Sequence, residues 1–296
     1  MIKNSNFMLC LMILASMFLF GCSTSQSKGI KNSQHNTKIA DKSAVAPSDN
    51  LFDSDDLKNV KTFGIITAME EEILDLKNMI EIEEIIESAK LQFYVGKFDS
   101  DKKIILVKSG IGKVNMASCA QHLIDKFNID VLINIGVCGA INDKLKVGDL
   151  VVAKDLVQYD FDLSAFKYQI GFIPEADKVF FDAGKKILEL AEKFNSEQEK
   201  KKDENNNIYF GRIASGDRFV CDQKDKDFIK KNFDADCVEM EGASAAQVAF
   251  LNNIPFAVIR VISDGANSNA VESYNQSVDS VTKNYLKLIE YVIKNY

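Results

Sequence analysis

The sequence predicts one α/β domain from about residue 60 to residue 296, preceded by a segment outside the fold. From Lys61 onward, short apolar runs alternate with longer segments of helical periodicity. No Pro- or Gly-rich break interrupts this alternation, so one domain is favoured over two. Hydrophobic residues make up 46% of the 296 residues, which is enough to bury a large core.

Apolar runs with many β-branched residues identify the strands. Runs of this kind, bounded by turn residues, are typical of strands buried in a sheet. They occupy, in order, residues 62–68, 93–98, 103–107, 131–135, 150–153, 208–215, 237–239 and 256–262.

Helical spacing of apolar residues identifies the helices. In the charged segment Glu70–Glu87, for example, Ile73, Leu76 and Ile80 recur at helical spacing. Helices are expected at residues 70–87, 114–127, 178–194, 241–251 and 273–295. The polar run 196–207 is expected to be a solvated loop.

Composition excludes several kinds of site. A net charge of −7 lacks the basic surface expected of a nucleic-acid-binding protein. The two histidines, His35 and His122, cannot build a zinc site of several imidazoles. None of the six cysteines forms a C-x-x-C pair, and those of the domain are expected to be small buried hydrophobes: Cys119, Cys138, Cys221 and Cys237. We therefore expect no metal and a chemistry based mainly on carboxylates.

The N-terminal segment has the pattern of a secretion signal. Lys3 precedes an apolar run at residues 7–20, which is short for a transmembrane helix. The sequence Leu19-Phe-Gly-Cys22 resembles the lipobox of bacterial lipoproteins. We expect a signal peptide at residues 1–21, a lipidated Cys22 with a flexible tether to residue 60, and a location at the cell membrane or surface. An uncleaved anchor is the alternative, and the chain would be cytoplasmic if the signal is not used.

Residues that could take part in catalysis or ligand binding gather where the expected strands end. They are Glu70–Glu72, Gly136–Gly139, Ser215–Phe219, Glu239–Glu241 and Ser263–Gly265. Taken singly, each has an ordinary structural explanation, such as acidic residues that complement a helix dipole or an Asp-Gly turn. Ligands of α/β folds bind at the carboxyl ends of strands, so the shared position predicts a site built on carboxylates.

Seven blocks of the chain, in order, resemble the 5′-methylthioadenosine/S-adenosylhomocysteine nucleosidases of the purine nucleoside phosphorylase fold. The blocks are residues 64–72, 108–114, 134–139, 145–149, 215–219, 238–241 and 261–264. The resemblance implies a three-layer α-β-α sandwich on a central twisted mixed sheet, in a catalytic domain over residues 61–296. It further implies a homodimer that releases adenine and a thioribose product from these nucleosides by hydrolysis, without a cofactor.

The resemblance assigns the two catalytic roles to carboxylates. Adenine leaves well only when a ring nitrogen is protonated, and water attacks well only when a base takes its proton. The family pattern makes Asp264 the acid toward adenine N7, with Ser263 orienting it, and Glu72 the base toward water. Glu241 matches the residue that accepts hydrogen bonds from the ribose hydroxyls, and Glu239, two residues earlier, would lie on the same face if the strand continues.

The remaining site residues follow from the same resemblance. Met240 is expected to pack on the sugar and Phe219 to stack on the purine. Backbone groups of Val220 would read the adenine edge, and Gly139 would allow close backbone approach. Tyr274 lies where the family has an aromatic residue near the substrate tail. Three further positions match residues that reach into the partner subunit's pocket: Leu163, Phe166 and Pro174.

Two alternative functions remain open from the sequence. A phosphorylase of the same fold would need a phosphate pocket, typically with arginines, and the chain has only Arg212, Arg218 and Arg260. A surface lipoprotein that binds nucleosides or polyanions is an alternative from a different functional class. Lysine-rich surfaces attract polyanions, which is the reason for considering the second kind of ligand. A pure receptor would not need both Glu72 and Asp264.

Overall fold

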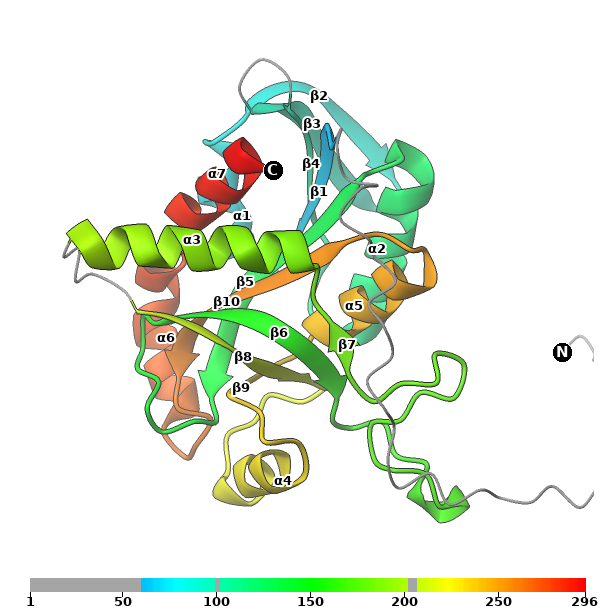
Figure 1. Cartoon of the computed structure of the whole chain (residues 1–296), viewed down its shortest axis with the longest axis vertical. Helices are drawn as coiled ribbons and strands as arrows, with labels where there is room; N and C mark the ends of the chain where they lie inside the picture. The colour runs from blue at the N-terminus through cyan, green and yellow to red at the C-terminus, as the bar shows by residue number, and fades with distance from the viewer. Residues whose placement is uncertain (1–59, 99–101, 202–206) are drawn as a thin grey trace, which may run out of the picture. The chain divides into compact units, whose positions relative to one another are not determined.

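A mixed sheet is the framework of the fold in the computed structural model, which describes residues 60–98, 102–201 and 207–296 (Figure 1). Its strands are β1 Thr62–Thr67, β2 Glu81–Ser88, β3 Leu91–Phe98, β4 Lys102–Lys108, β5 Val131–Ala140, β6 Leu150–Gln158, β7 Phe181–Asp182, β8 Ile208–Ser215, β9 Cys237–Glu239 and β10 Phe256–Asp264. The helices are α1 Glu70–Lys77, α2 Lys113–Phe127, α3 Lys185–Lys201, α4 Gln223–Phe233, α5 Gly242–Leu251, α6 Ala270–Val281 and α7 Leu286–Asn295, with a 3-10 turn at Ser164–Phe166.

Part of the sheet closes on itself. The strand order is β10-β6-β8-β9-β5-β1-β4-β3-β2, and β10 also pairs with β5. The strands β5, β10, β6, β8 and β9 therefore form a closed ring, from which β1, β4, β3 and β2 extend as an open arm. The register places Gly139 of β5 beside Asp264 of β10 and beside Val238 of β9. Ring closure thus brings together residues that lie far apart along the chain.

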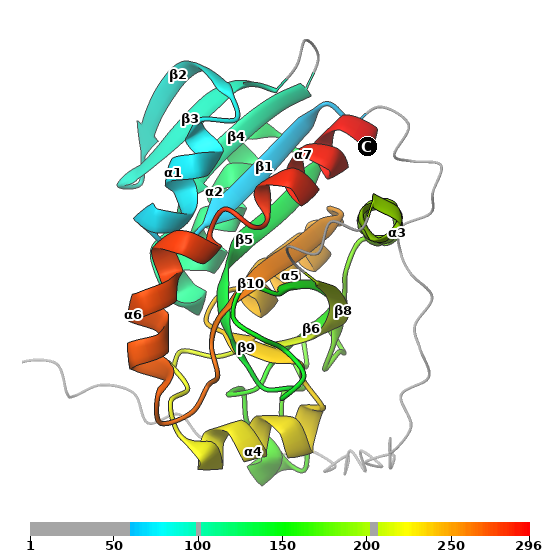
Figure 2. The same ribbon diagram turned by 90° about the vertical axis from the view of Figure 1, so that its left-hand side faces the viewer.

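Helices cover both faces of the sheet, as Figures 1 and 2 show. Side chains of α2 and α5, such as Leu123 and Ala246, pack in one core with β1 and β5 residues. Side chains of α1, α3 and α7, such as Ile73 and Leu288, pack in a second core on the other side. Helix α4 lies against the ends of β8 and β9 through Ile229. The three-layer α-β-α sandwich expected from the sequence is confirmed.

The helix expected at Glu70–Glu87 is wrong in its second half. Helix α1 ends at Lys77, and Glu81–Ser88 is the edge strand β2, antiparallel to β3. Glutamates favour a helix in isolation, but β3 offers a row of backbone partners that decides the conformation. The charged side chains suit an edge strand, because they oppose pairing with another chain.

The ends of several other strands and helices differ from those expected from the sequence. Strands β5 and β6 run on to Ala140 and Gln158, beyond the expected ends at residues 135 and 153. The helix expected at residues 178–194 starts only at Lys185, after the short strand β7, and extends to Lys201 into the run expected to be a loop. The C-terminal helix is two helices, α6 and α7. Helix α4 was not expected at all.

Three of the four cysteines of the domain are buried as expected. Cys221 is the exception, because it is exposed in the turn that leads into α4. The expected signal peptide, Cys22 and the tether lie outside the described residues. Within the described ranges, no helix combines the length and apolarity needed to cross a bilayer.

Candidate active site

Glu72 is buried at the start of α1, directly after β1. Its Oε2 accepts the amide N–H groups of Ala68 and Met69, at 2.8 and 2.9 Å. Its Oε1 accepts the amide of Val137 in β5, at 3.1 Å. Burial raises the pKa of Glu72, whereas Arg260 and these three amides oppose the rise. The result is a carboxylate fixed in direction and made more basic, which suits a general base.

A residue from the C-terminal part of the chain binds the backbone of Glu72. The hydroxyl of Tyr285 donates to the backbone carbonyl of Glu72 at 2.8 Å. Tyr285 itself is fully buried and lies in the short connection between α6 and α7. The first turn of α1 is thereby fixed at both its side-chain and backbone groups.

Asp264 is the last residue of β10 and is also buried. Its Oδ2 accepts the hydroxyl of Ser263 at 2.8 Å, and its Oδ1 accepts the amide of Ala266 at 2.8 Å. Burial raises the pKa of Asp264, with these two hydrogen bonds and the charge of Lys226 opposing it. A carboxyl that holds its proton more firmly in a cleft is suited to donate it to a leaving group.

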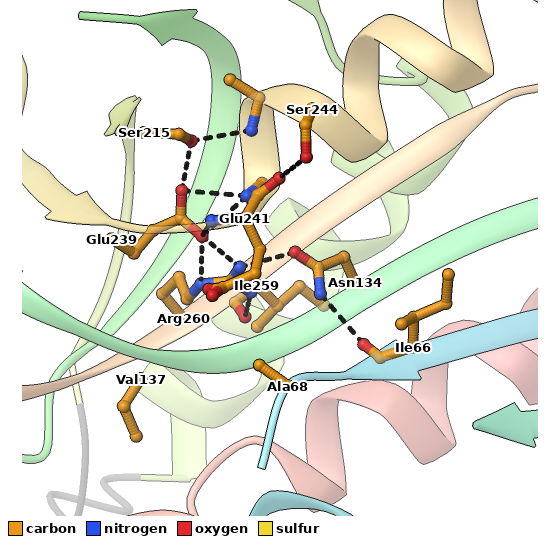
Figure 3. A network of polar contacts seen from close by, with 12 residues as sticks. Ile66, Ala68, Asn134, Val137, Ser215, Glu239, Glu241, Ser244, Ile259 and Arg260 are labelled. Carbon is orange, nitrogen blue, oxygen red and sulfur yellow. Dashed lines mark hydrogen bonds and ion pairs between the residues drawn. The ribbon is translucent and has the colours of Figure 1, made fainter. Parts of the chain in front are cut away.

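A buried ion pair joins β9 to β10 (Figure 3). Arg260, almost wholly buried, donates from Nε to Glu239 Oε2 at 3.1 Å, and its Nη2 bonds both Glu239 and Asn134 of β5. The hydroxyl of Ser215 and the amide of Gly242 also donate to Glu239. Each oxygen of Glu239 therefore accepts at least two protein donors. The sequence placed Glu239 among the substrate contacts, but its carboxylate is occupied in holding the ring of strands together.

Glu241 is buried beside this pair, and its Oε1 accepts the amide of Gly112 at 2.8 Å. Burial and the nearby charge of Glu239 raise the pKa of Glu241 to about 8, although Arg260 opposes the rise. The charge of Glu72 raises it further, so these two carboxylates act on one another across the site. Three buried carboxylates thus share the single guanidinium of Arg260, and one proton is readily held among them.

Aromatic residues stand near Glu72 and Asp264. The ring of Phe219, which is 40% exposed, meets the ring of Tyr274 edge-on at 5.9 Å. The hydroxyl of Tyr274 donates to Met69 Sδ at 3.1 Å. Burial raises the pKa of Tyr274 to about 12, and the charges of Glu72 and Asp264 contribute. Tyr274 therefore lies within electrostatic reach of both carboxylates, and Phe219 lies beside it.

Strand β5 contacts both Glu72 and Asp264. A Cβ built on Gly136 would meet Glu72, and one built on Gly139 would meet Asp264. The two carboxylates therefore lie against different positions of the same strand, three residues apart.

The other residues expected at the site come from three separate segments of the chain. Val220 is buried next to Phe219, and Met240 is half-buried between Glu239 and Glu241. Leu163, Phe166 and Pro174 lie in the segment after β6, where Phe166 is 73% exposed. Within the described residues, no group of three or more His, Cys, Asp and Glu side chains could hold a metal ion.

Arg260, Asn134 and Lys226 were not recognised from the sequence as part of the site. A signal for Arg260 was present, because it is the one charge inside the apolar run FAVIRVIS of β10. A charge in such a strand needs a buried partner. The identity of that partner depends on the pairing of β5, β9 and β10.

The fold, with its ring of strands and its buried carboxylates, places the chain in the phosphorylase superfamily, whose family model matches residues 62–294. Within this class, the chain belongs to the family of the 5′-methylthioadenosine/S-adenosylhomocysteine nucleosidases, as its relatives show. A nucleosidase of this name from Staphylococcus haemolyticus is 38% identical over 232 residues, which are 78% of this chain and 98% of the relative.

Solved structures agree with the sequence relatives. The Helicobacter pylori nucleosidase of this family matches with a TM-score of 0.75 and 34% identity. That structure is a complex with a pyrrolidinol that carries an aminopyrrolopyrimidine and a propynylthio group. The match covers 81% of this chain and 100% of that one. A futalosine hydrolase of Helicobacter pylori strain 26695 also matches with a TM-score of 0.75 and 34% identity, over 80% of this chain and 99% of that one.

Proposed function

We propose that this chain hydrolyses the N-glycosidic bond of 5′-methylthioadenosine and S-adenosylhomocysteine, releasing adenine and the thioribose product. The observation that carries the proposal is the pair of buried carboxylates with raised pKa, Glu72 and Asp264. They stand at separate positions along β5 and are each oriented by hydrogen bonds. Family membership supports the choice of substrate.

Each carboxylate has one task in this reaction. Asp264 donates a proton to adenine as the glycosidic bond breaks, so that adenine leaves as a neutral base. Glu72 accepts a proton from the water that attacks the sugar carbon. Glu241 binds the ribose hydroxyls, and its exchangeable proton lets it act as donor or acceptor toward them. Phe219 and Tyr274 provide an aromatic wall for the purine and the thio substituent.

The pairing of the arginines supports water rather than phosphate as the nucleophile. Arg212 pairs with Asp155, Arg218 with Asp222 and Asp225, and Arg260 with Glu239. These are all the arginines of the chain. Since each is already bound to a carboxylate, a phosphate ion would have to displace a protein partner.

The test is adenine release from methylthioadenosine with and without inorganic phosphate. We expect equal rates in both, with free methylthioribose as the sugar product. A requirement for phosphate, with a sugar 1-phosphate as product, would establish the phosphorylase alternative instead. Binding of the nucleoside without turnover would indicate a receptor.

We also propose that the active form is a homodimer in which Leu163, Phe166 and Pro174 reach the partner's site. The exposed ring of Phe166 in the segment after β6 supports this, because a large exposed aromatic side chain favours an interface. Light scattering should give the mass of a dimer. We expect Phe166→Ala to raise the KM of the dimer; a fully active monomer would contradict the proposal.

We further propose that the chain is a lipoprotein, cleaved before Cys22 and held at the membrane or cell surface. Support comes from the apolar run at residues 7–20, the Gly21-Cys22 pair and the polar segment that follows. The protein should incorporate labelled fatty acid and partition into detergent, and Cys22→Ala should lose both properties while keeping nucleosidase activity. An unlabelled soluble protein that still starts at Met1 would contradict this.

A further inference from the structure

Lys226 is the one lysine among the buried side chains of the described residues, and its ammonium binds the turn that carries Asp264. It lies in the first turns of α4 and is 9% exposed. Its Nζ donates to the carbonyl of Gly265 at 3.1 Å and to Asp143 Oδ1 at 3.0 Å. One side chain therefore connects α4, the segment after β5 and the turn after β10.

The ion pair with Asp143 does not by itself explain a lysine at this position. The side chain of Asp143 is 93% exposed, and ion pairs open to water contribute little to stability. Packing does not require an amine either, since Ile229 and Phe233 supply the apolar face of α4. The distinctive contact is the bond to the Gly265 carbonyl.

That carbonyl belongs to the same peptide group as the amide that binds Asp264. The Gly265 carbonyl accepts from Lys226, and the Ala266 N–H of the same planar unit donates to Asp264 Oδ1 at 2.8 Å. A hydrogen-bonded chain thus runs from the ammonium through one peptide group to the carboxyl. Bonds in such a chain polarise one another, so a cation at one end strengthens the N–H donor at the other.

We propose that Lys226 is a positioning residue for the general acid: through the Gly265–Ala266 peptide group it fixes the orientation of the Asp264 carboxyl. The inference rests on the proposed function, which makes Asp264 the acid. With Oδ1 held as an acceptor, the carboxyl proton is carried on Oδ2. Ser263 then turns its hydroxyl to its second acceptor, the carbonyl of Cys138 at 3.2 Å, and leaves Oδ2 able to donate.

The charge of Lys226 adds to this geometric effect. It lowers the pKa of Asp264 against the larger effect of burial. The other titratable side chains that interact with Asp264 are Cys138 of β5 and Tyr274 of α6, and neither supplies a positive charge. Loss of the ammonium would therefore make Asp264 a weaker proton donor as well as a less well oriented one.

The experiment compares two leaving groups in Lys226→Met. Adenine of methylthioadenosine needs protonation, whereas 4-nitrophenolate of 4-nitrophenyl 5-methylthio-β-D-ribofuranoside leaves as a stable anion. We expect kcat for methylthioadenosine to fall on the order of 10- to 100-fold, with KM changed by less than about threefold. For the nitrophenyl substrate, kcat should stay within about threefold. A structural role alone would lower both rates alike.

Three further variants control the comparison. Lys230→Met removes a lysine one turn along α4 that pairs only at the surface with Asp234, and should change neither rate. Lys226→Arg keeps the charge and the donors and should recover most of kcat. If Lys226→Met does not fold, Lys226→Gln keeps a polar neutral side chain and carries the same expectation.

Asp264→Asn separates the inference from the proposed function. If this variant loses both substrates equally, or neither, the assignment of the acid is wrong. If Asp264→Asn loses only the adenine substrate and a folded Lys226→Met does not share that selective loss, the acid stands and the role of Lys226 is overturned.

Discussion

Gly136 faces Glu72 so closely that a Cβ at residue 136 would lie 2.7 Å from Oε1 of the carboxylate. Gly139, three residues along β5, is related to Asp264 in the same way, with 2.8 Å to Oδ1. Neither glycine has a positive φ, so close approach and not backbone conformation requires them. A single strand thus leaves space for both carboxylates, the proposed base and the proposed acid.

Gly136→Ala should therefore disable Glu72, the proposed base, while keeping the fold. The new methyl group would push Glu72 away from the amide of Val137, and a displacement of about 1 Å in a catalytic group can cost on the order of 100-fold in rate. Overpacking of this kind costs about 1–3 kcal/mol of stability. Steady-state kinetics and a thermal melt measure the two effects. Wild-type kcat in a well-folded variant would show that Glu72 tolerates displacement.

Glu72→Gln and Asp264→Asn should each lower kcat by about 100- to 10,000-fold, because each removes one proton-transfer group and keeps its shape. Both side chains are buried and hydrogen-bonded, so circular dichroism and melting temperature must accompany the kinetics. Losses below tenfold in two folded variants would mean that other groups carry the protons.

Glu241→Gln should weaken substrate binding and turnover together, because the ribose must stay held as positive charge develops on it. The 2′,3′-dideoxy analogue of methylthioadenosine lacks the hydroxyls that we propose this carboxylate binds. It should be a much poorer substrate than methylthioadenosine for the wild type, but only slightly poorer for the variant. If both enzymes discriminate against it equally, Glu241 does not contact those hydroxyls.

The stability of the free protein should fall as pH rises from about 5 to 8. Glu241 has a pKa of about 8 in the fold and an ordinary value of 4.5, so in this window the folded state binds more protons than the unfolded state. Stability conferred by its protonated form is full below the unfolded value and is lost as pH rises through the folded one. The raised pKa values of Glu72 and Asp264 act in the same direction.

Urea unfolding at several pH values measures this effect. Each pKa unit corresponds to about 1.4 kcal/mol, and Glu241→Gln should flatten the slope because it removes the titrating group. A slope unchanged in the variant would assign the proton to another carboxylate of the cluster.

Arg260→Met should destabilise the protein by about 3–5 kcal/mol, because it leaves Glu239 buried without its counter-charge. Adding Glu239→Gln should recover part of the loss. Arg218→Met is the matched control, since Arg218 is 59% exposed at its side chain and pairs at the surface, where about 1 kcal/mol or less is expected. Denaturant midpoints measure all three. Equal effects at Arg260 and Arg218 would contradict the importance of burial.

Local patterns were sufficient to predict the strands that end at the site. The run Phe256–Ile262 lies within β10, and residues 208–215 match β8, because buried strands are short, apolar and β-branched. Edge strand β2 was missed because its glutamates mask the strand pattern. Helix α4 was missed because lysines and aspartates dominate it, and Ile229 and Phe233 are its only buried apolar residues.

The partners within the site could not be read from the sequence. Asp264 and Glu72 were identified through a resemblance that spans both of their motifs. The bonds from Arg260 to Glu239 and from Lys226 to Gly265 depend on which strands and helices become neighbours. Such neighbours are fixed by the topology of the whole sheet, and no local periodicity encodes them.

The closed ring of strands also constrains how the chain can acquire its site during synthesis. The ring closes only through β10, the last strand to leave the ribosome, whose Arg260 bonds Asn134 across 126 residues of chain. Until that strand docks, Glu239 lacks its counter-charge and Asp264 has no neighbour in β5. Contacts of such long range form late and slowly. A nascent or C-terminally truncated chain should therefore be unable to cleave a nucleoside, whatever fraction of its helices has already formed.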